Sequence, residues 1–325
     1  MSARSSARDR AEHALFRAGE TALRALPAAA RQALGRRLGR LYLSLVPARR
    51  RILLANLARA FPEKSPEEVA AIGRASAEWV GAAFVDFLDV SRLSADAVRD
   101  RIRVDGEDHF ARARARGKGV FLLSAHIGGW ELGAIRAGLI TDPIAPVVRP
   151  LDNVRLEREL AERRTRLGNR IIAKRDAARD ILRAMARAET VAILVDQNVL
   201  AREAVFVPFF GRPAATTPAL ALFQLKTDAA VVPVFTWPEG AGRYRLEFET
   251  PILAEEFRHL PREDAIRAAT ARYMQVTEAA VRKAPEVWLW MHDRWRTQPT
   301  PPTQPTQEAG GGRPEAGSAT EAGKA

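Results

Sequence analysis

From about residue 101 onward, the chain alternates short runs rich in β-branched and aromatic residues with amphipathic stretches at helical spacing. This alternation is typical of a sheet whose strands are connected by helices packed on its faces. We therefore predict an α/β fold with a central, mostly parallel or mixed sheet flanked by helices. The strands are expected at residues 119–125, 144–149, 170–173, 191–196, 204–210, 229–237 and 243–249.

The first hundred residues have a different pattern. Leucine and alanine recur at helical spacing among arginines over residues 14–61, and another helix is expected after the Pro62–Pro66 break, with Ser65 as its N-cap. This pattern fits an ordinary packed helix pair with a solvated basic side. It equally fits a membrane-surface anchor in which LYLSLV (41–46) enters the interface and the arginines at 49–51 meet lipid phosphates.

Composition suggests four regions. Residues 1–10 are polar and expected to be flexible, and residues 11–100 are expected to form a helical membrane-associating region. Residues 101–299 hold the α/β domain, with a last helix at about 262–283. Residues 300–325 lack large apolar side chains and are expected to be a disordered tail. No stretch approaches the roughly 18–20 uncharged apolar residues of a spanning helix, and no signal peptide is apparent.

Charge and cysteine content narrow the chemistry. The absence of cysteine excludes a disulfide framework, a thiolate nucleophile and a cysteine-ligated zinc site, and it fits a reducing cytoplasmic setting. A net charge of +12 favours an anionic partner such as nucleic acid, anionic lipid or a phosphorylated substrate. Aromatic stacking platforms interleaved with basic residues are not evident on the strands, which argues against nucleic acid.

The stretch VFLLSAHIGGWELG (120–133) carries the main candidate site. His126 follows a buried-looking strand and lies in a glycine-rich turn that opens a helix, where α/β sheets bind ligands. Glu131 is close enough to reach one imidazole nitrogen, which would fix the tautomer and raise the basicity of the other nitrogen. Such a pair can remove a proton from a substrate hydroxyl. The alternative is that His126 is a structural core residue whose imidazole is hydrogen-bonded to a backbone carbonyl.

Other motifs are weaker. His259 and Asp264 repeat the same spacing, but they lie in a charged approach to a helix and read as surface structure. The chain lacks HExxH, G-x-S-x-G, P-loop and G-x-G-x-x-G motifs, and no metal site is predicted. WPEGAGR (237–243) reads as a hairpin turn between two strands.

The AHIGGWE element resembles the H-x4-E/D motif of the bacterial lipid A late acyltransferases, the lauroyl and myristoyl transferases of the lysophospholipid acyltransferase superfamily. The resemblance covers roughly residues 30–299. It departs from the family at Gly129, where asparagine is common, and in a weaker N-terminal hydrophobic anchor. The other matching segments are LLANLARAFPEKSPEE (53–68), VVRPLDN (147–153), VDQNVLAREAVFVPFFGRPAATTPALA (195–221), AVVPVF (230–235) and MHDRWRTQP (291–299).

The resemblance implies an O-acyltransferase that needs no cofactor, with acyl carrier protein or coenzyme A thioester as donor and a membrane glycolipid, a lipid A precursor, as acceptor. It implies His126 as the general base and Glu131 as its partner. It also implies that the protein lies at the cytoplasmic face of the inner membrane, bound peripherally or monotopically to an anionic surface. The further implied residues are Arg149 for a phosphate or the donor, Asp196 and Gln197 for the site floor, Phe209, Phe210 and Gly211 for an acyl-chain wall, and the Gly128 and Gly129 N–H groups for the oxyanion.

Two alternatives remain. One is an acyltransferase for another lipid, such as a phosphoinositol mannoside or an ornithine- or glycerol-based lipid. The other is a non-catalytic basic protein of the membrane surface.

Overall fold

A seven-stranded sheet forms the centre of the computed structural model, which describes residues 3–140, 143–174 and 177–299. Its strand order is β1-β9-β8-β2-β5-β3-β4. Five neighbouring strands from β8 to β4 run parallel, while β9 is antiparallel to β8 and carries β1 beside it. The strands are β1 Ile102–Asp105, β2 Val120–Ser124, β3 Ile144–Val148, β4 Ile172–Ala173, β5 Thr190–Leu194, β8 Ala230–Gly240 and β9 Arg243–Phe248.

The predicted α/β class with a mixed, mostly parallel sheet is therefore confirmed. All seven expected strands are present, six of them in the parallel part or the β8–β9 hairpin and the seventh, β6, in a separate ribbon. Gly240 and Gly242 form the turn of that hairpin with φ of +87° and +72°, as the WPEGAGR segment predicted. Two short strands were not predicted: β1, and β7 at Arg212–Thr216, which pairs with β6 at Val205–Phe209 in a separate ribbon.

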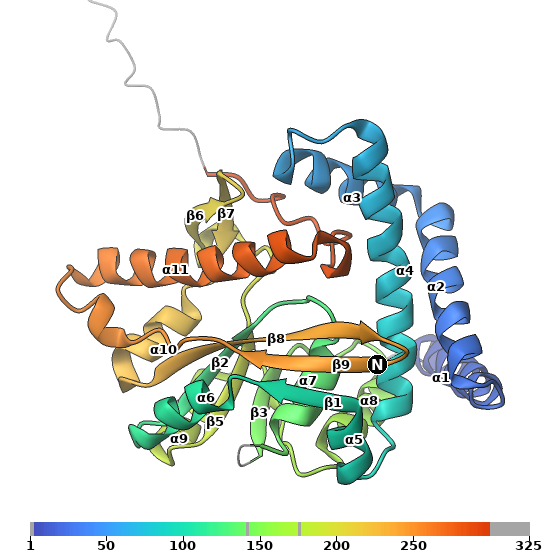
Figure 1. Cartoon of the computed structure of the whole chain (residues 1–325), viewed down its shortest axis with the longest axis horizontal. Helices are drawn as coiled ribbons and strands as arrows, with labels where there is room; N and C mark the ends of the chain where they lie inside the picture. Colours follow the sequence, from blue (N-terminus) through green and yellow to red (C-terminus); the bar gives the residue numbers. More distant parts are fainter. Residues whose placement is uncertain (1–2, 141–142, 175–176, 300–325) are drawn as a thin grey trace, which may run out of the picture.

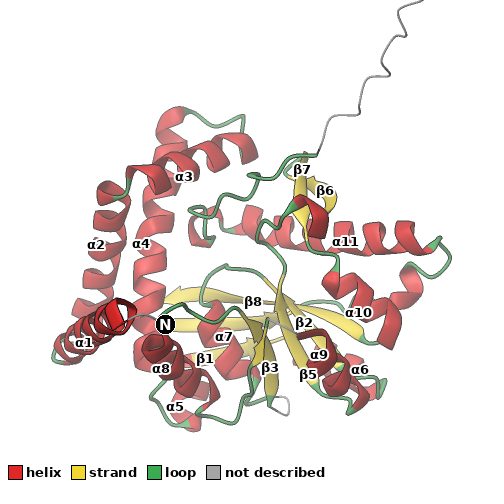
Figure 2. Cartoon of the chain, turned by 180° about the vertical axis from the view of Figure 1, so that it is seen from behind, coloured by secondary structure: helices red, strands yellow, loops and turns green. Residues whose placement is uncertain are grey.

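Helices surround the sheet. In both views α11 and the β6–β7 ribbon lie on one side of the sheet, and α5 and α8 lie on the other (Figures 1 and 2). The helix of the last expected range, α11, spans Arg262–Lys283. The remaining helices of this region are α5 Ala95–Arg101, α6 Glu107–Ala115, α7 Trp130–Ala137, α8 Val154–Thr165, α9 Ala177–Ala186 and α10 Ala219–Thr227, with short 3-10 turns at Ala201–Glu203, Ala254–Glu256 and Pro285–Val287.

The N-terminal region consists of α1 Ala3–Arg24, α2 Ala28–Leu45, α3 Pro47–Ala60 and α4 Pro66–Val90. Ser65 caps α4 as predicted, because its Oγ accepts the Glu68 N–H at 3.3 Å and the Glu68 carboxylate accepts the Ser65 N–H at 2.8 Å. Helix α1 already begins at Ala3, so residues 3–10, which we expected to be flexible, are helical. Residues 1 and 2 and the expected tail at 300–325 lie outside the described residues.

Helices α2 and α4 stand side by side at one end of the sheet (Figure 1). Glycines allow this close approach: a Cβ added at Gly39 would lie 2.0 Å from the Ala77 carbonyl oxygen, and one added at Gly81 would lie 2.1 Å from the Gly35 oxygen. The backbones of the two helices are therefore in direct contact along this seam.

Helix α4 is also tied to the sheet. The buried Asp86 carboxylate accepts hydrogen bonds from the Tyr244 hydroxyl of β9 at 2.5 Å and from Gln32 Nε2 of α2 at 2.7 Å. The Ser76 hydroxyl donates to the Trp288 carbonyl oxygen at 2.6 Å. As a result, α4 connects the outer helix α2 with the sheet and with the C-terminal segment.

Candidate active site

His126 lies two residues beyond the end of β2, in the turn that leads to α7. Gly128 has a φ of +56°, and a Cβ there would meet the Thr236 carbonyl oxygen at 1.8 Å, so the turn requires glycine. The C-terminal segment packs along the same turn, because the Leu289 N–H donates to the His126 carbonyl oxygen at 3.0 Å. The position of the imidazole is thus set by a strand end, a glycine turn and a distant segment.

Asp196 is the partner of this imidazole. Strands β2 and β5 are parallel neighbours, so the residues that follow them meet at the same edge of the sheet. His126 Nδ1 lies 2.8 Å from Asp196 Oδ1, while Oδ2 accepts the His126 backbone N–H at 2.9 Å and the Trp288 Nε1–H at 2.8 Å. Since a carboxylate only accepts, Nδ1 carries the proton and Nε2 carries the lone pair that can act as a base.

Electrostatics support this pairing. Burial disfavours the imidazolium, but the charge of Asp196 and its hydrogen bond outweigh burial and raise the pKa of His126. Burial opposes the ionised form of Asp196 as well, yet the charge of His126 and the hydrogen bonds hold the pKa of this carboxyl below its usual value. Half-buried His126 and buried Asp196 therefore stabilise each other's charged forms.

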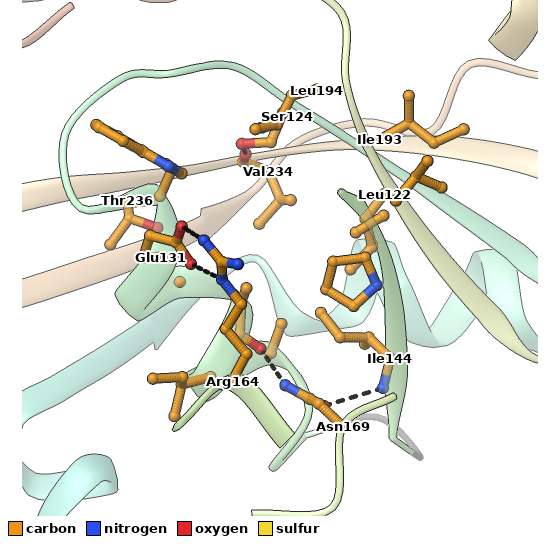
Figure 3. A pocket seen from close by; sticks show the side chains of 18 of the residues that line it. Leu122, Ser124, Glu131, Ile144, Arg164, Asn169, Ile193, Leu194, Val234 and Thr236 are labelled. Carbon is orange, nitrogen blue, oxygen red and sulfur yellow. Dashed lines mark hydrogen bonds and ion pairs between the residues drawn. The ribbon is translucent and has the colours of Figure 1, made fainter. Parts of the chain in front are cut away.

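Glu131 does not contact the imidazole, contrary to our expectation. Its carboxylate accepts two hydrogen bonds from the Arg164 guanidinium of α8, at 2.9 Å from Nε and 2.6 Å from Nη2 (Figure 3). The bidentate geometry of this pair holds the carboxylate toward α8. Asp196 takes the place at Nδ1, and Glu131 acts on His126 only as a nearby negative charge.

Two cavities meet at the Glu131–Arg164 pair. The larger one, of about 680 Å³, lies between α2, α4, the start of α7 and the segment 289–292, and its lining is mostly apolar. The smaller one, of about 80 Å³, lies under α7 against β2, β3 and β5, and is the pocket drawn in Figure 3. Trp130, whose ring centroid is 5.3 Å from that of His126, also lines both. A long apolar chain therefore has room beside the base.

The remaining expected site residues divide into two groups. Gln197 is at the site, with Nε2 at 3.2 Å from His126 Nε2, and the exposed Arg149 follows β3 at the same sheet edge. Phe209 and Phe210 are instead buried in the core, where Phe209 packs against Trp288 at 5.7 Å between centroids. With Gly211 they do not line either cavity at the Glu131–Arg164 pair.

The expected oxyanion donors are already occupied. The Gly128 N–H donates to the Val287 carbonyl oxygen at 2.8 Å, and the Gly129 N–H donates to the Thr236 oxygen at 3.0 Å. Both acceptors lie more than a hundred positions away in sequence, so a local pattern cannot reveal them. In this conformation neither N–H is free to meet a substrate oxygen.

Sequence reasoning also missed Arg164, Trp288 and His292. Arg164 is one of several arginines on an amphipathic helix and has no local signature. Trp288 and His292 belong to VWLWMHDRW, where a histidine between tryptophans is a local signal for a site residue.

Comparison with known proteins gives the class of this site. The family model described as bacterial lipid A biosynthesis acyltransferase matches residues 5–297. The chain is 29% identical to the lipid A biosynthesis lauroyltransferase of Escherichia coli over 270 residues, covering 82% of this chain and 85% of the relative. It is 28% identical to the palmitoleoyltransferase of the same organism over 268 residues, with the same coverage. A phosphatidylinositol mannoside acyltransferase of Mycobacterium tuberculosis is 28% identical over 146 residues, 44% of this chain and 46% of the relative.

The protein is thus an acyltransferase. More particularly, it belongs to the bacterial lipid A biosynthesis acyltransferase family, which the resemblance of its spaced motifs had indicated. In the part of the chain that the structure describes, no helix combines the length and apolar character needed to cross a bilayer.

Proposed function

We propose that the protein transfers a fatty acyl chain from a thioester, carried by acyl carrier protein or coenzyme A, to a hydroxyl of a lipid A precursor. The observation that carries this proposal is the pair formed by half-buried His126 and buried Asp196, placed beside an apolar cavity of about 680 Å³. The pair supplies a base with a fixed tautomer, and the cavity has the volume and lining that an acyl chain requires.

In the proposed reaction, His126 Nε2 takes the proton of the acceptor hydroxyl as its oxygen attacks the thioester carbonyl carbon. The tetrahedral intermediate collapses with cleavage of the carbon–sulfur bond, and the departing thiolate receives the proton from the imidazolium. Asp196 keeps the proton on Nδ1 and stabilises the transient imidazolium. Because Gln197 Nε2 now lies at the Nε2 lone pair, its exposed side chain must turn aside when the hydroxyl binds.

Glu131 and Arg164 have a second role in this proposal. They form an ion pair where the two mostly apolar cavities meet. The polar groups of this pair are proposed to orient the polar end of a substrate next to the base. Arg149, which is exposed and makes no ion pair within the described residues, is proposed to hold a phosphate of donor or acceptor at the same sheet edge.

The N-terminal region, residues 11–100, is proposed to bind the cytoplasmic face of the inner membrane. Large apolar side chains are exposed on α2 and α4, and three of them also line the larger cavity, which would let a lipid pass from the bilayer to the base. The exposed residues are Leu38, Leu41, Tyr42, Leu45 and Phe84.

A second candidate is an acyltransferase for a phosphoinositol mannoside, favoured by the similarity to the mycobacterial relative over 146 residues. The two candidates share the same base and differ in the acceptor. Mass spectrometry of cellular lipids with and without the gene distinguishes them, since the lipid that loses an acyl chain is the acceptor.

The base is tested in vitro with the purified protein, an acyl thioester and the acceptor. His126→Ala is expected to lower kcat by about 10²–10⁴-fold while the fold is kept. His259→Ala, at an exposed histidine outside the site, serves as the matched control and should leave kcat unchanged. Equal behaviour of the two variants would contradict the assignment.

Arg149→Ala should raise KM for the phosphorylated substrate, and an unchanged KM removes Arg149 from the site.

A further inference from the structure

The proposed reaction develops a negative charge on the thioester carbonyl oxygen, and that charge needs a hydrogen-bond donor. The Gly128 and Gly129 N–H groups are already bonded to Val287 and Thr236. These two N–H groups are therefore not available to the oxyanion, and a side chain beside the base is a candidate donor.

His292 is a second imidazole at the site. It lines the larger cavity together with Gly128, Trp130 and Glu131. Its Nε2 lies 2.8 Å from the backbone nitrogen of Asn198, whose N–H can only donate. Nε2 is thus the acceptor and the proton of the neutral imidazole is on Nδ1. Within the described residues, this Nδ1–H has no hydrogen-bond partner.

The surroundings of His292 hold it in place. Asn56, fully buried in α3, donates from Nδ2 to the His292 carbonyl oxygen at 2.7 Å and to that of Trp290 at 2.9 Å. On the other side, Asn198 follows Gln197, which contacts His126 Nε2. One loop therefore joins the base and the second imidazole.

The ionisation state of His292 fits a donor that stays neutral. Burial lowers the pKa of His292 and outweighs the charge of Asp196, which raises it, while the charge of nearby His126 acts in the same direction as burial. A neutral imidazole can donate to a developing oxyanion without taking part in the proton transfer.

We propose that His292 is a further catalytic residue, whose Nδ1–H donates a hydrogen bond to the thioester carbonyl oxygen as that oxygen becomes negative. This inference rests on the proposed acyl transfer. No proton moves to or from His292: it remains neutral, while His126 carries the proton from the hydroxyl to the leaving thiolate.

Three variants separate donation to the substrate from support of the Asn198 loop. His292→Ala removes both groups. His292→Asn keeps an N–H near the position of Nδ1 but gives up the acceptor for Asn198, whereas His292→Gln keeps an acceptor near the position of Nε2 and gives up the Nδ1 donor. Steady-state kinetics are measured with purified full-length protein and an acyl-coenzyme A donor, and thermal denaturation checks that each variant folds.

We expect His292→Ala to lower kcat by about 10²–10³-fold with little change in KM. His292→Asn should recover part of kcat and His292→Gln should not. Recovery by His292→Gln alone would overturn the inference and assign His292 to holding the loop. Unchanged kcat in His292→Ala, with kcat lost in His126→Ala, would overturn the inference and leave the acyl-transfer proposal intact. Retained kcat in His126→Ala would instead defeat the acyl-transfer proposal itself.

Discussion

Asp196 accepts hydrogen bonds from the His126 imidazole, the His126 backbone and Trp288, so the protonation of His126 depends on a carboxylate that is itself locked in place. Because the imidazole acts as a base only when Nε2 is unprotonated, kcat/KM should fall as pH falls through the raised pKa of His126. The apparent pKa in the pH–rate profile is expected above the ordinary value of about 6.5. A profile with no inflection in this region would contradict the assignment.

The same shift has the opposite effect on stability. A histidine whose pKa is raised by folding contributes stability that is fully present below its unfolded pKa, about 6.5, and is lost as pH rises through the folded pKa. Thermal denaturation of wild type and His126→Ala over a pH series should therefore show a difference that shrinks as pH rises, while the activity of wild type increases.

Asp196→Asn tests the orientation of the base. One side-chain oxygen of Asp196 becomes an N–H₂ group in asparagine. Because this group donates and cannot accept, at least one of the three donors to Asp196 loses its hydrogen-bond partner. We expect kcat to fall by up to about 10⁴-fold, the apparent pKa of His126 to fall, and the free energy of unfolding to drop by about 1–3 kcal/mol. Asp264→Asn, at an exposed position in the first turn of α11, is the control and should leave kcat and the apparent pKa of His126 unchanged.

At the scale of elements, local patterns predicted what local interactions determine. The Ser65 cap, the bounds of α11 and the β8–β9 turn each depend on a few neighbouring residues, and the structure has all three. Strand β1 was not predicted because four residues, IRVD, cannot show a period. Strand β7 was not predicted because its sequence, RPAAT, contains a proline and has no apolar alternation.

In the site, too, features set by neighbouring residues were predicted and contacts between distant residues were not. His126 was found because a strand end and a glycine turn are local signals, whereas Asp196 was placed at the site only through the family resemblance. The partner of Glu131 was wrong, since nothing near Glu131 indicates that α8 brings Arg164 within 2.6 Å. Pairings across 33 residues or more are set by packing, and a single sequence does not record them.

The glycine seam between α2 and α4 gives a prediction at this scale. Gly39→Ala places a methyl group 2.0 Å from the Ala77 oxygen, so the helices must separate, at a cost of about 1–3 kcal/mol in the free energy of unfolding. Gly19→Ala in α1, where an added Cβ meets no atom within 4 Å, should instead stabilise by about 0.5–1 kcal/mol. Urea denaturation of both variants checks this, and equal changes in stability would show that the seam is not close-packed.

At the scale of the whole molecule, a net charge of +12 and the exposed apolar residues of α2 act together. We expect binding to anionic vesicles that weakens as salt rises, because lipid phosphates attract the basic surface only over a Debye length of about 10 Å at 0.1 M salt. Leu45, 70% exposed, should contribute through burial in the interface.

Leu45→Glu is accordingly expected to weaken vesicle binding by about tenfold or more, since burying a leucine is worth about 1.5–3 kcal/mol. Leu222→Glu in α10, at the other end of the sheet (Figure 1), makes the same change in charge at an exposed leucine and is the matched control. Vesicle co-sedimentation compares the two variants, and equal loss of binding would mean that charge alone governs attachment.

The segment Pro285–His292 supplies Trp288 to Asp196 and the Val287 oxygen to the turn that holds His126. This segment is synthesised long after α2 and α4, whose exposed apolar side chains are proposed to meet lipid. On that proposal, a chain emerging from the ribosome displays the helices that meet lipid before its histidine can be oriented. If α2 and α4 bind lipid as proposed, the chain attaches to the membrane before it becomes active, and we expect a product that stops short of residue 285 to bind membrane without acyltransferase activity.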